Sequence, residues 1–298
     1  MKDFCGLISI VGRPNVGKST LLNRLIEQKI SITSRKSQTT RNNILGIKTK
    51  DNHQMVFIDT PGVHINASKV MNKVLNQSAL GAIEDADLII FMLQRNKINT
   101  LDELILERLK GVETKKICVI NKLDQVASIN SLLPVVEKLR SENDFAEIIP
   151  VSAKTGKNIN ELENMICQNL PENNHLYDSD TKFLAKESFM ISEIIREKII
   201  RFLGEELPHE TYVQLQKLED KENIINIDAE IIVARESQKG IVVGKNGAKL
   251  KKIGEKARID LEKFFNKKVF LKTWVKTKKN WNNDSDFISS LGIGSLYD

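Results

Sequence analysis

The sequence lacks any apolar run long enough to cross a membrane as a helix. Its longest strongly apolar run, Leu88–Leu93, is far shorter than the roughly 18 residues that a membrane-spanning helix requires. The N-terminal stretch MKDFCGLISIVGRP also lacks the layout of a signal peptide, because its apolar residues lead directly into a glycine loop. Hydrophobic residues make up 41% of the chain and charged residues 28%, which predicts an ordinary soluble globular protein.

Cysteine and histidine are scarce and scattered. The cysteines form no C-x-x-C pair, which argues against a disulfide framework and against a thiolate zinc site. The histidines suggest no metal cluster either. We therefore expect structural roles for Cys5, Cys118, Cys167, His53, His64, His175 and His209.

Positive charge is concentrated in one part of the chain. The net charge is +6, but residues 235–279 alone hold 15 Lys and Arg against four acids, a local balance of +11 that leaves −5 for the rest. A neutral-to-acidic body with one basic segment indicates a polyanion site confined to that segment. The alternative is a solvated lysine-rich face.

The first half of the sequence alternates between short apolar runs and helical patterns. Strands separated by helices favour a mostly parallel sheet with right-handed crossovers, and ligands then bind at the carboxyl ends of the strands. We expect strands at Leu7–Val11, Met55–Ile58, Leu88–Leu93, Ile117–Ile120 and Ile148–Val151, and helices that include Ser19–Gln28, Lys69–Ile83 and Ile129–Arg140.

The polar stretch PENNHLYDSDTK, residues 171–182, interrupts this alternation. We therefore predict an α/β domain over residues 1–172, a linker over 173–182 and a smaller α+β domain over 183–298. The second domain is expected to contain a helix at Phe183–Leu203, strands at Tyr212–Leu218 and Ile224–Val233, a helix at Ala248–Phe265 and a strand at Lys268–Val275.

The strongest motif follows the first predicted strand. The stretch GRPNVGKST fits G-x-x-x-x-G-K-[ST] between a strand and a helix, where backbone N–H groups and the helix N-terminus cradle a di- or triphosphate. Lys18 is expected to reach the β- and γ-phosphates, and the Ser19 hydroxyl to ligate Mg²⁺. The predicted binding residues are Gly12, Arg13, Pro14, Asn15, Val16, Gly17, Lys18, Ser19 and Thr20.

A second motif, D-T-P-G, follows the next predicted strand. Asp59 is placed to hold Mg²⁺ through water, and the Gly62 amide to sense the γ-phosphate. This part of the predicted nucleotide site comprises Asp59, Thr60, Pro61, Gly62 and Val63.

The base is predicted to be guanine. A carboxylate at the end of the N-K-L-D motif can accept two hydrogen bonds from guanine N1–H and the exocyclic amine, whereas adenine would leave it unpaired. A lysine in the same motif can lie over the base, and backbone N–H groups of S-A-K can donate to the guanine carbonyl. The residues concerned are Asn121, Lys122, Leu123, Asp124, Ser152, Ala153 and Lys154.

Between the phosphate loop and Asp59 lies the polar stretch SRKSQTTRNN, where a nucleotide-sensing switch loop is expected. Thr40 is the expected second hydroxyl on Mg²⁺. Thr39 is the alternative, and spacing alone does not separate the two.

A second glycine turn, Gly244-Lys245-Asn246-Gly247, lies inside the basic segment. The apolar residues after it are spaced by three or four positions, which predicts an amphipathic helix and argues against a simple hairpin turn. These residues are Leu250, Ile253, Ala257, Leu261 and Phe264.

The ordered set GRPNVGKST, SQTTR, DTPGV, NKLD and SAK, followed by GIVVGKNGAKLKKIG, resembles the Era family of bacterial GTPases over nearly the whole chain. The resemblance implies a P-loop GTPase domain with a mostly parallel sheet, followed by a type II KH domain. It also implies assistance in 30S ribosomal subunit assembly through binding of 16S ribosomal RNA near its 3′ end. Family members are cytoplasmic and partly peripheral on the inner membrane, and we expect a monomer. The tail after Trp281 departs from the family by being less basic and slightly long.

In KH domains a G-x-x-G turn joins two helices and lets a single-stranded nucleic-acid backbone approach closely. By the resemblance, the two glycines provide that approach and the neighbouring lysines neutralise phosphates. The implied RNA-binding residues are Gly244, Lys245, Asn246, Gly247, Lys249, Lys251 and Lys252.

The catalytic set is predicted as Lys18, Asn15, Thr40 and Gly62. Many GTPases place a glutamine directly after D-x-x-G to orient the attacking water, but here that residue is Val63, so intrinsic turnover should be slow. Related GTPases with an asparagine at the place of Asn15 are thought to hold K⁺, which would supply positive charge at the phosphates. The alternative is that Asn15 braces the loop through its side-chain amide.

Two other functions compete with an RNA-coupled GTPase. A pure RNA-binding protein with a vestigial nucleotide site is disfavoured by the intact Lys18, Ser19, Asp59 and Asp124. A GTPase that places its basic helix on anionic lipid has no need of G-x-x-G, so this turn favours RNA.

Overall fold

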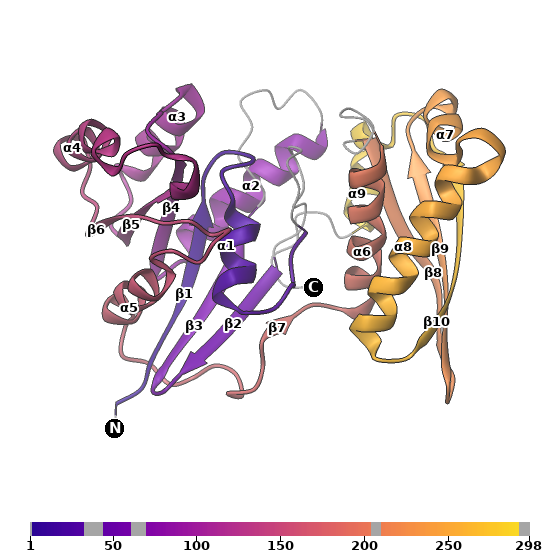
Figure 1. The fold of residues 1–298 in the computed structure, drawn as a ribbon, viewed down its shortest axis with the longest axis horizontal. Coiled ribbons are helices and arrows are strands. Elements are labelled where there is room, and N and C mark those ends of the chain that lie inside the picture. The colour runs from indigo at the N-terminus through magenta and orange to yellow at the C-terminus, as the bar shows by residue number, and fades with distance from the viewer. Residues whose placement is uncertain (1, 33–43, 61–69, 204–209, 292–298) are drawn as a thin grey trace.

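The structure, a computed structural model, describes residues 2–32, 44–60, 70–203 and 210–291. These residues form two domains, one drawn from indigo through magenta to rose and the other from salmon through orange to yellow in Figure 1. No helix in these ranges is long and apolar enough to span a membrane.

The first domain is built on a seven-stranded sheet. Four strand pairs within it are parallel, while β2 and β7 add two antiparallel pairs at one edge. The predicted mostly parallel α/β architecture is therefore confirmed. The strand order is β6 (Glu147–Pro150), β5 (Lys115–Asn121), β4 (Leu88–Gln94), β1 (Phe4–Val11), β3 (His53–Asp59), β2 (Ile44–Lys50) and β7 (Phe183–Leu184).

Helices cover both faces of this sheet (Figure 1). The fully buried strand β4 shows why: its alternate side chains enter two different apolar cores. One core is closed by α1 (Lys18–Leu25) and α5 (Ile159–Asn169), and the other by α3 (Thr100–Leu109), α4 (Leu133–Glu142) and the end of α2 (Val70–Glu84).

Two predicted helices differ from the observed ones. The helix expected at Ile129–Arg140 is a 3₁₀ turn, Ile129–Leu132, followed by α4, because Pro134 fits only the first turn of an α-helix. The helix expected from Phe183 begins only at Glu187, because residues 183 and 184 pair with β2 as the short strand β7.

The stretch predicted as a linker, residues 173–182, is fastened to the first domain. The buried side chain of Gln54 accepts hydrogen bonds from the backbone N–H groups of Leu176 at 2.8 Å and Tyr177 at 3.0 Å, and donates to the Tyr177 carbonyl at 2.7 Å. The pairing of β7 follows, so the chain leaves the first sheet after Leu184 and not at residue 173.

The second domain packs two helices on one face of a three-stranded sheet. The strand order is β10 (Lys268–Thr277), β9 (Ile224–Val233) and β8 (Thr211–Asp220), with β10 parallel and β8 antiparallel to β9. Helices α6 (Glu187–Phe202) and α8 (Ala248–Phe265) share its apolar core with the inward-facing side chains of the strands. A shorter helix, α7 (Glu236–Val243), precedes the glycine turn.

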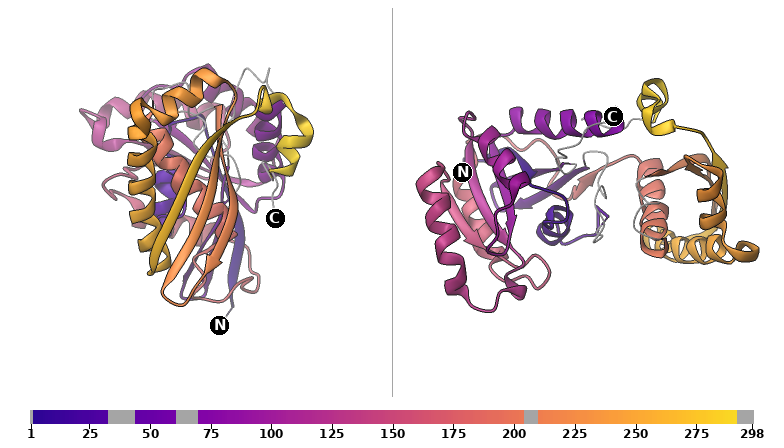
Figure 2. Two further views of the ribbon diagram at one scale, coloured as in Figure 1. Left: turned by 90° about the vertical axis from the view of Figure 1, so that its right-hand side faces the viewer. Right: turned by 90° about the horizontal axis from the view of Figure 1, so that it is seen from above.

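The tail after β10 joins the two domains. It forms a 3₁₀ turn, Trp281–Asn283, and a short helix, α9 (Ser285–Ser290). Trp281 is fully buried and shares an apolar cluster with Met71 and Leu75 of α2 in the first domain. Figure 2 (right) shows α9 between the end of α2 and the second domain.

Replacing Trp281 by alanine should destabilise this contact. Loss of a fully buried tryptophan costs about 3–5 kcal/mol, so the melting temperature measured by calorimetry should fall. The control Phe270→Ala removes a side chain that is 56% exposed on β10 and should cost no more than about 0.5 kcal/mol. Equal melting temperatures for the two variants would show that the tail is not an integral part of the fold.

Candidate nucleotide site and nucleic-acid interface

The phosphate loop joins β1 to α1 and requires glycine at both ends. Gly12 and Gly17 have φ values of 154° and 113°. A Cβ on Gly12 would lie 2.7 Å from the Met92 carbonyl oxygen, and one on Gly17 would lie 2.2 Å from Asn121 Nδ2. The loop therefore packs its backbone directly against the neighbouring strand ends, while Val16 is buried in the core below it.

Lys18 lies folded over this loop. Its Nζ donates to the Gly12 carbonyl at 2.9 Å and to the Arg13 carbonyl at 3.3 Å. Burial lowers the pKa of Lys18 to about 8, with a smaller lowering from Arg13, although the charge of Asp59 acts in the opposite direction. A bound anion would favour the protonated form again, as expected of a phosphate ligand.

The two predicted magnesium-site residues for which the structure gives positions lie together. Asp59 is fully buried at the end of β3, and its Oδ2 accepts a hydrogen bond from Ser19 Oγ at 2.8 Å. A carboxylate and a hydroxyl are hard oxygen donors of the kind that Mg²⁺ prefers, so the pair fits the ion. Thr60 uses its hydroxyl differently, donating to the Ile10 carbonyl at 2.8 Å. The predictions for Thr39, Thr40, Pro61, Gly62 and Val63 lie outside the described residues.

Asn121 connects three loops. Its Nδ2 donates to the Val16 carbonyl at 2.9 Å, and its Oδ1 accepts from the Ala153 N–H at 3.0 Å. The next residue, Lys122, has φ of 67° and donates from Nζ to the Asn15 carbonyl at 2.8 Å. The phosphate loop and the two loops predicted to read the base are thereby held together.

Asp124 faces the loop that contains S-A-K. Its Oδ1 accepts from Ser152 Oγ at 2.6 Å, and the Thr155 N–H donates to the same hydroxyl oxygen at 3.2 Å. Arg24 of α1 holds the other side of this loop, donating to the carbonyls of Ala153 at 3.2 Å and Lys154 at 2.6 Å. The predicted base-reading residues, including Leu123, therefore lie close together at the carboxyl ends of β5 and β6.

Two partners of the predicted nucleotide-site residues escaped prediction. The fully buried Asp102 accepts from Arg13 Nε at 3.1 Å and also caps α3 together with Asn99. Gln94 accepts from Lys122 Nζ at 2.6 Å. An N-cap pattern, Asn99 followed by Asp102, was visible in the sequence, but nothing there indicated the contact with Arg13.

The second glycine turn lies between α7 and α8, as predicted. Gly244, Asn246 and Gly247 all have positive φ, at 71°, 51° and 76°. Lys245 and Asn246 are exposed. The turn therefore presents its backbone and two polar side chains to solvent.

A groove of about 410 Å³ runs from this turn between α8 and β10. Of the lysines predicted to contact RNA, Lys251 lines it, whereas Lys252 Nζ lies 5.2 Å from the ring centre of Phe202 on α6 and Lys249 packs beside Gly244. Six residues that were not predicted to contact RNA line it as well: Leu250, Gly254, Glu255, Arg258, Leu271 and Thr273. The groove is therefore formed by a helix and a strand that are adjacent only in the folded domain.

Comparisons with known proteins match both domains. A family model described as 50S ribosome-binding GTPase matches residues 7–122, and a KH domain model matches residues 206–282. The GTPase Era proteins of Haemophilus influenzae and Coxiella burnetii are each 46% identical, over 98% and 97% of this chain and 97% and 98% of theirs.

Solved structures show the same likeness. A crystal structure of Era in complex with MgGDPNP and nucleotides 1506–1542 of 16S ribosomal RNA has a TM-score of 0.94 at 36% identity, covering 97% of this chain and 99% of that one. A variant of Aquifex aeolicus Era bound to GDP.AlF4- has a TM-score of 0.93 at 35% identity, covering 98% and 99%.

Asp124→Asn tests the base-reading role. The amide would place an N–H donor opposite the guanine amine, whereas xanthine presents a carbonyl there. We expect the preference for GTP over XTP to shift by about 100-fold or more toward XTP. The measurement is a competition titration with both nucleotides. Asp144→Asn, at an exposed position paired with Lys116, is the matched control. An unchanged preference in Asp124→Asn would remove this residue from base reading.

Proposed function

This chain belongs to the Era family of GTPases, and from that membership we propose that it is a GTP-hydrolysing switch that binds 16S ribosomal RNA near its 3′ end and assists 30S subunit assembly. The observation that carries the proposal is the presence of both sites in one chain. A phosphate loop with its base-reading loops lies in the first domain, and a G-x-x-G turn opens a groove in the second.

The first domain supplies the residues for nucleotide binding. The backbone of the phosphate loop and Lys18 bind the phosphates, and Ser19 and Asp59 hold Mg²⁺, with Thr40 as the second hydroxyl. When bound, this ion neutralises charge on the β- and γ-phosphate oxygens. Asp124 reads guanine, with the Ser152–Lys154 loop beside it, and its hydrogen bond from Ser152 Oγ supports this role by fixing the carboxylate.

Hydrolysis in the free protein is proposed to be slow. The Gly62 amide senses the γ-phosphate, but the apolar side chain of Val63 cannot hydrogen-bond an attacking water. The chain therefore needs another source of water positioning or charge, such as an ion at the phosphate loop or a partner on the ribosomal subunit.

The second domain supplies the RNA site. Single-stranded RNA lies along the groove between α8 and β10, with its backbone against Gly244 and Gly247 and its phosphates near Lys245, Lys249 and Lys251. Leu271 and Thr273 on β10 offer contacts to the bases. Lys252 lies beside Phe202 and attracts the RNA phosphates from a longer distance through its charge. We further propose a cytoplasmic monomer with a peripheral fraction at the inner membrane.

Replacing Lys245 and Asn246 by aspartates should abolish RNA binding. Two carboxylates would face the phosphates at an exposed turn, and one favourable counterion-release contribution would be lost. We expect at least about a tenfold loss of affinity, because one phosphate contact is lost and two repulsive charges are added. The measurement is a titration with labelled single-stranded RNA that matches the 3′ end of the 16S RNA.

GTP affinity is the internal control for this variant and should be unchanged, because the turn lies in the other domain. The exposed control Lys217→Asp on β8 alters charge away from the groove and should bind RNA nearly as well as the wild type. If the double-aspartate variant binds RNA like the wild type, the turn is not the RNA clamp and the charge of α8 becomes the explanation.

K⁺ at the phosphate loop is proposed through Asn15. This residue is exposed with φ of 65°, and its carbonyl accepts from Lys122 Nζ. Within the described part of the chain its side-chain amide makes no hydrogen bond, which leaves it available to an ion. The positive φ also suits asparagine by itself, so a backbone role is the competing explanation.

Hydrolysis should be about tenfold faster in KCl than in NaCl at equal ionic strength, because K⁺ would add positive charge at the phosphates in the transition state. Phosphate release in the two salts is the measurement. Asn15→Ala should remove the difference, while Asn130→Ala, in the 3₁₀ turn before α4, should preserve it. Equal wild-type rates in both salts would leave Asn15 with a backbone role only.

A further inference from the structure

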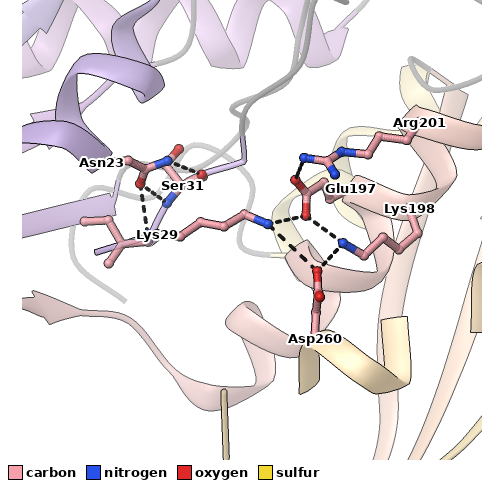
Figure 3. A network of polar contacts seen from close by, with 8 residues as sticks. Asn23, Lys29, Ser31, Glu197, Lys198, Arg201 and Asp260 are labelled. Atoms are coloured by element: carbon pink, nitrogen blue, oxygen red, sulfur yellow. Dashed lines mark hydrogen bonds and ion pairs between the residues drawn. The ribbon is translucent and has the colours of Figure 1, made fainter. Parts of the chain in front are cut away.

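Residues 29–31 run from the magnesium-site carboxylate to the second domain. Figure 3 shows the Lys29 side chain extending from the first domain to α6 and α8, while Asn23 holds the backbone beside Ser31. We propose that residues 29–31 couple Asp59 to the RNA-binding domain, with Ser31 as a positioning residue for Asp59 and Lys29 as the interdomain contact. This inference rests on the proposed function of the two sites.

The Ser31 end of this segment touches the nucleotide site. Ser31 is 3% exposed, and its Oγ donates to Asp59 Oδ2 at 2.6 Å, the same oxygen that accepts from Ser19 Oγ. Two hydroxyl donors therefore fix the orientation of one buried carboxylate. The proposed Mg²⁺ site requires that orientation, so displacement of Ser31 changes the carboxylate on which the ion depends.

The backbone between the two ends is held by one side chain. Asn23 Oδ1 accepts from the N–H groups of Ile30 and Ser31, each at 2.9 Å, and Asn23 Nδ2 donates to the Ser31 carbonyl at 2.7 Å. These three hydrogen bonds hold the segment against α1. Lys29 therefore adjoins a backbone segment that is hydrogen-bonded to α1, and a shift at Lys29 that moves this segment also moves Ser31.

The Lys29 end touches a buried carboxylate of the second domain. Lys29 Nζ lies 2.7 Å from Glu197 Oε2 and 3.9 Å from Asp260 Oδ2. Glu197 belongs to α6, and Asp260 to α8, the helix that begins at the G-x-x-G turn. The ammonium group therefore contacts both helices that pack on the three-stranded sheet of the second domain.

The charges of this cluster suit a contact that can open. Without Lys29, Glu197 still pairs with Arg201 at 2.6 Å and Lys198 at 3.1 Å, and Asp260 still pairs with Lys198. The two acids are then matched by two bases, so opening leaves no buried charge uncompensated. The Lys29 side chain is itself 52% exposed, so solvent can receive it when it leaves Glu197.

The test compares Lys29→Met with the matched control Lys50→Met. Lys50 has a side-chain exposure of 44% and pairs with Glu163 inside the first domain. The quantity measured is the coupling factor, the ratio of dissociation constants for a Mg²⁺-bound non-hydrolysable GTP analogue without and with saturating 16S 3′-end RNA. Lys29→Met should bring this factor about two- to fivefold closer to one, whereas Lys50→Met should leave it unchanged.

Ser31 is tested by a measurement that needs neither RNA nor turnover. Ser31→Ala should raise the Mg²⁺ concentration for half-maximal GDP binding by about two- to tenfold, because Asp59 loses one of the two hydroxyl donors that it has among the described residues. Ser31→Thr retains the hydroxyl and should restore the wild-type value. Melting temperatures identify any variant that has lost its fold.

The outcomes separate the inference from the proposed function. If the wild type fails to bind the RNA at all, the proposed function fails. If RNA binds but the wild-type coupling factor is one, or if Lys29→Met keeps the wild-type factor, the coupling is overturned while RNA binding stands. An unchanged Mg²⁺ requirement in Ser31→Ala overturns the positioning role.

Discussion

The side-chain amide of Asn121 is the interaction on which the nucleotide site depends. It lies against Gly17 so closely that no side chain fits there, and it joins the Val16 carbonyl to the Ala153 N–H. Each partner would lose its hydrogen bond if the amide were removed, at about 1–3 kcal/mol for each unsatisfied buried group. The phosphate loop, the N-K-L-D motif and the S-A-K loop therefore behave as one unit, although more than a hundred positions separate the first from the last. Parallel strands make this possible, because their carboxyl ends bring distant loops to one edge of the sheet.

The same geometry explains why so much of this site could be predicted from the sequence. Each motif is short and follows a strongly apolar strand, so its location in the fold followed from the strand alone. Contacts that depend on the rotation of a neighbouring helix could not be predicted in this way. Asp102 reaches Arg13 only because α3 begins beside the phosphate loop. Arg24 on α1 also reaches the Lys154 carbonyl in the loop after β6. The groove residue Thr273 is likewise separated from Gly247 by the whole of α8.

Strands that are buried on both faces of the sheet could be predicted from the sequence, whereas strands near its edge were harder to predict. Strand β4 is buried on both faces and reads as a continuous apolar run, whereas β2 mixes lysine and threonine with apolar residues because it lies near the edge. Strand β7 has only two residues, too few for any periodic pattern. The role of Gln54 could not be predicted from the sequence, because a single buried amide is identified only once its backbone hydrogen-bond partners are known. The polar composition of residues 173–182 indicated a linker, and their hydrogen bonds fasten it to the first domain.

The two domains meet through contacts of different physical kinds. The apolar cluster of Trp281 with Met71 and Leu75 is fully buried, and its opening would expose a large area of nonpolar surface to water. The Lys29 side chain is half exposed. When it leaves Glu197, the two acids Glu197 and Asp260 remain paired with two bases. An apolar contact is not screened by salt, whereas a partly exposed ion pair is weak and screened by salt. The tail thus keeps the domains attached while Lys29 is able to release α6 and α8. Such a division favours a hinge at the tail, about which the RNA-binding groove could change its position relative to the nucleotide site.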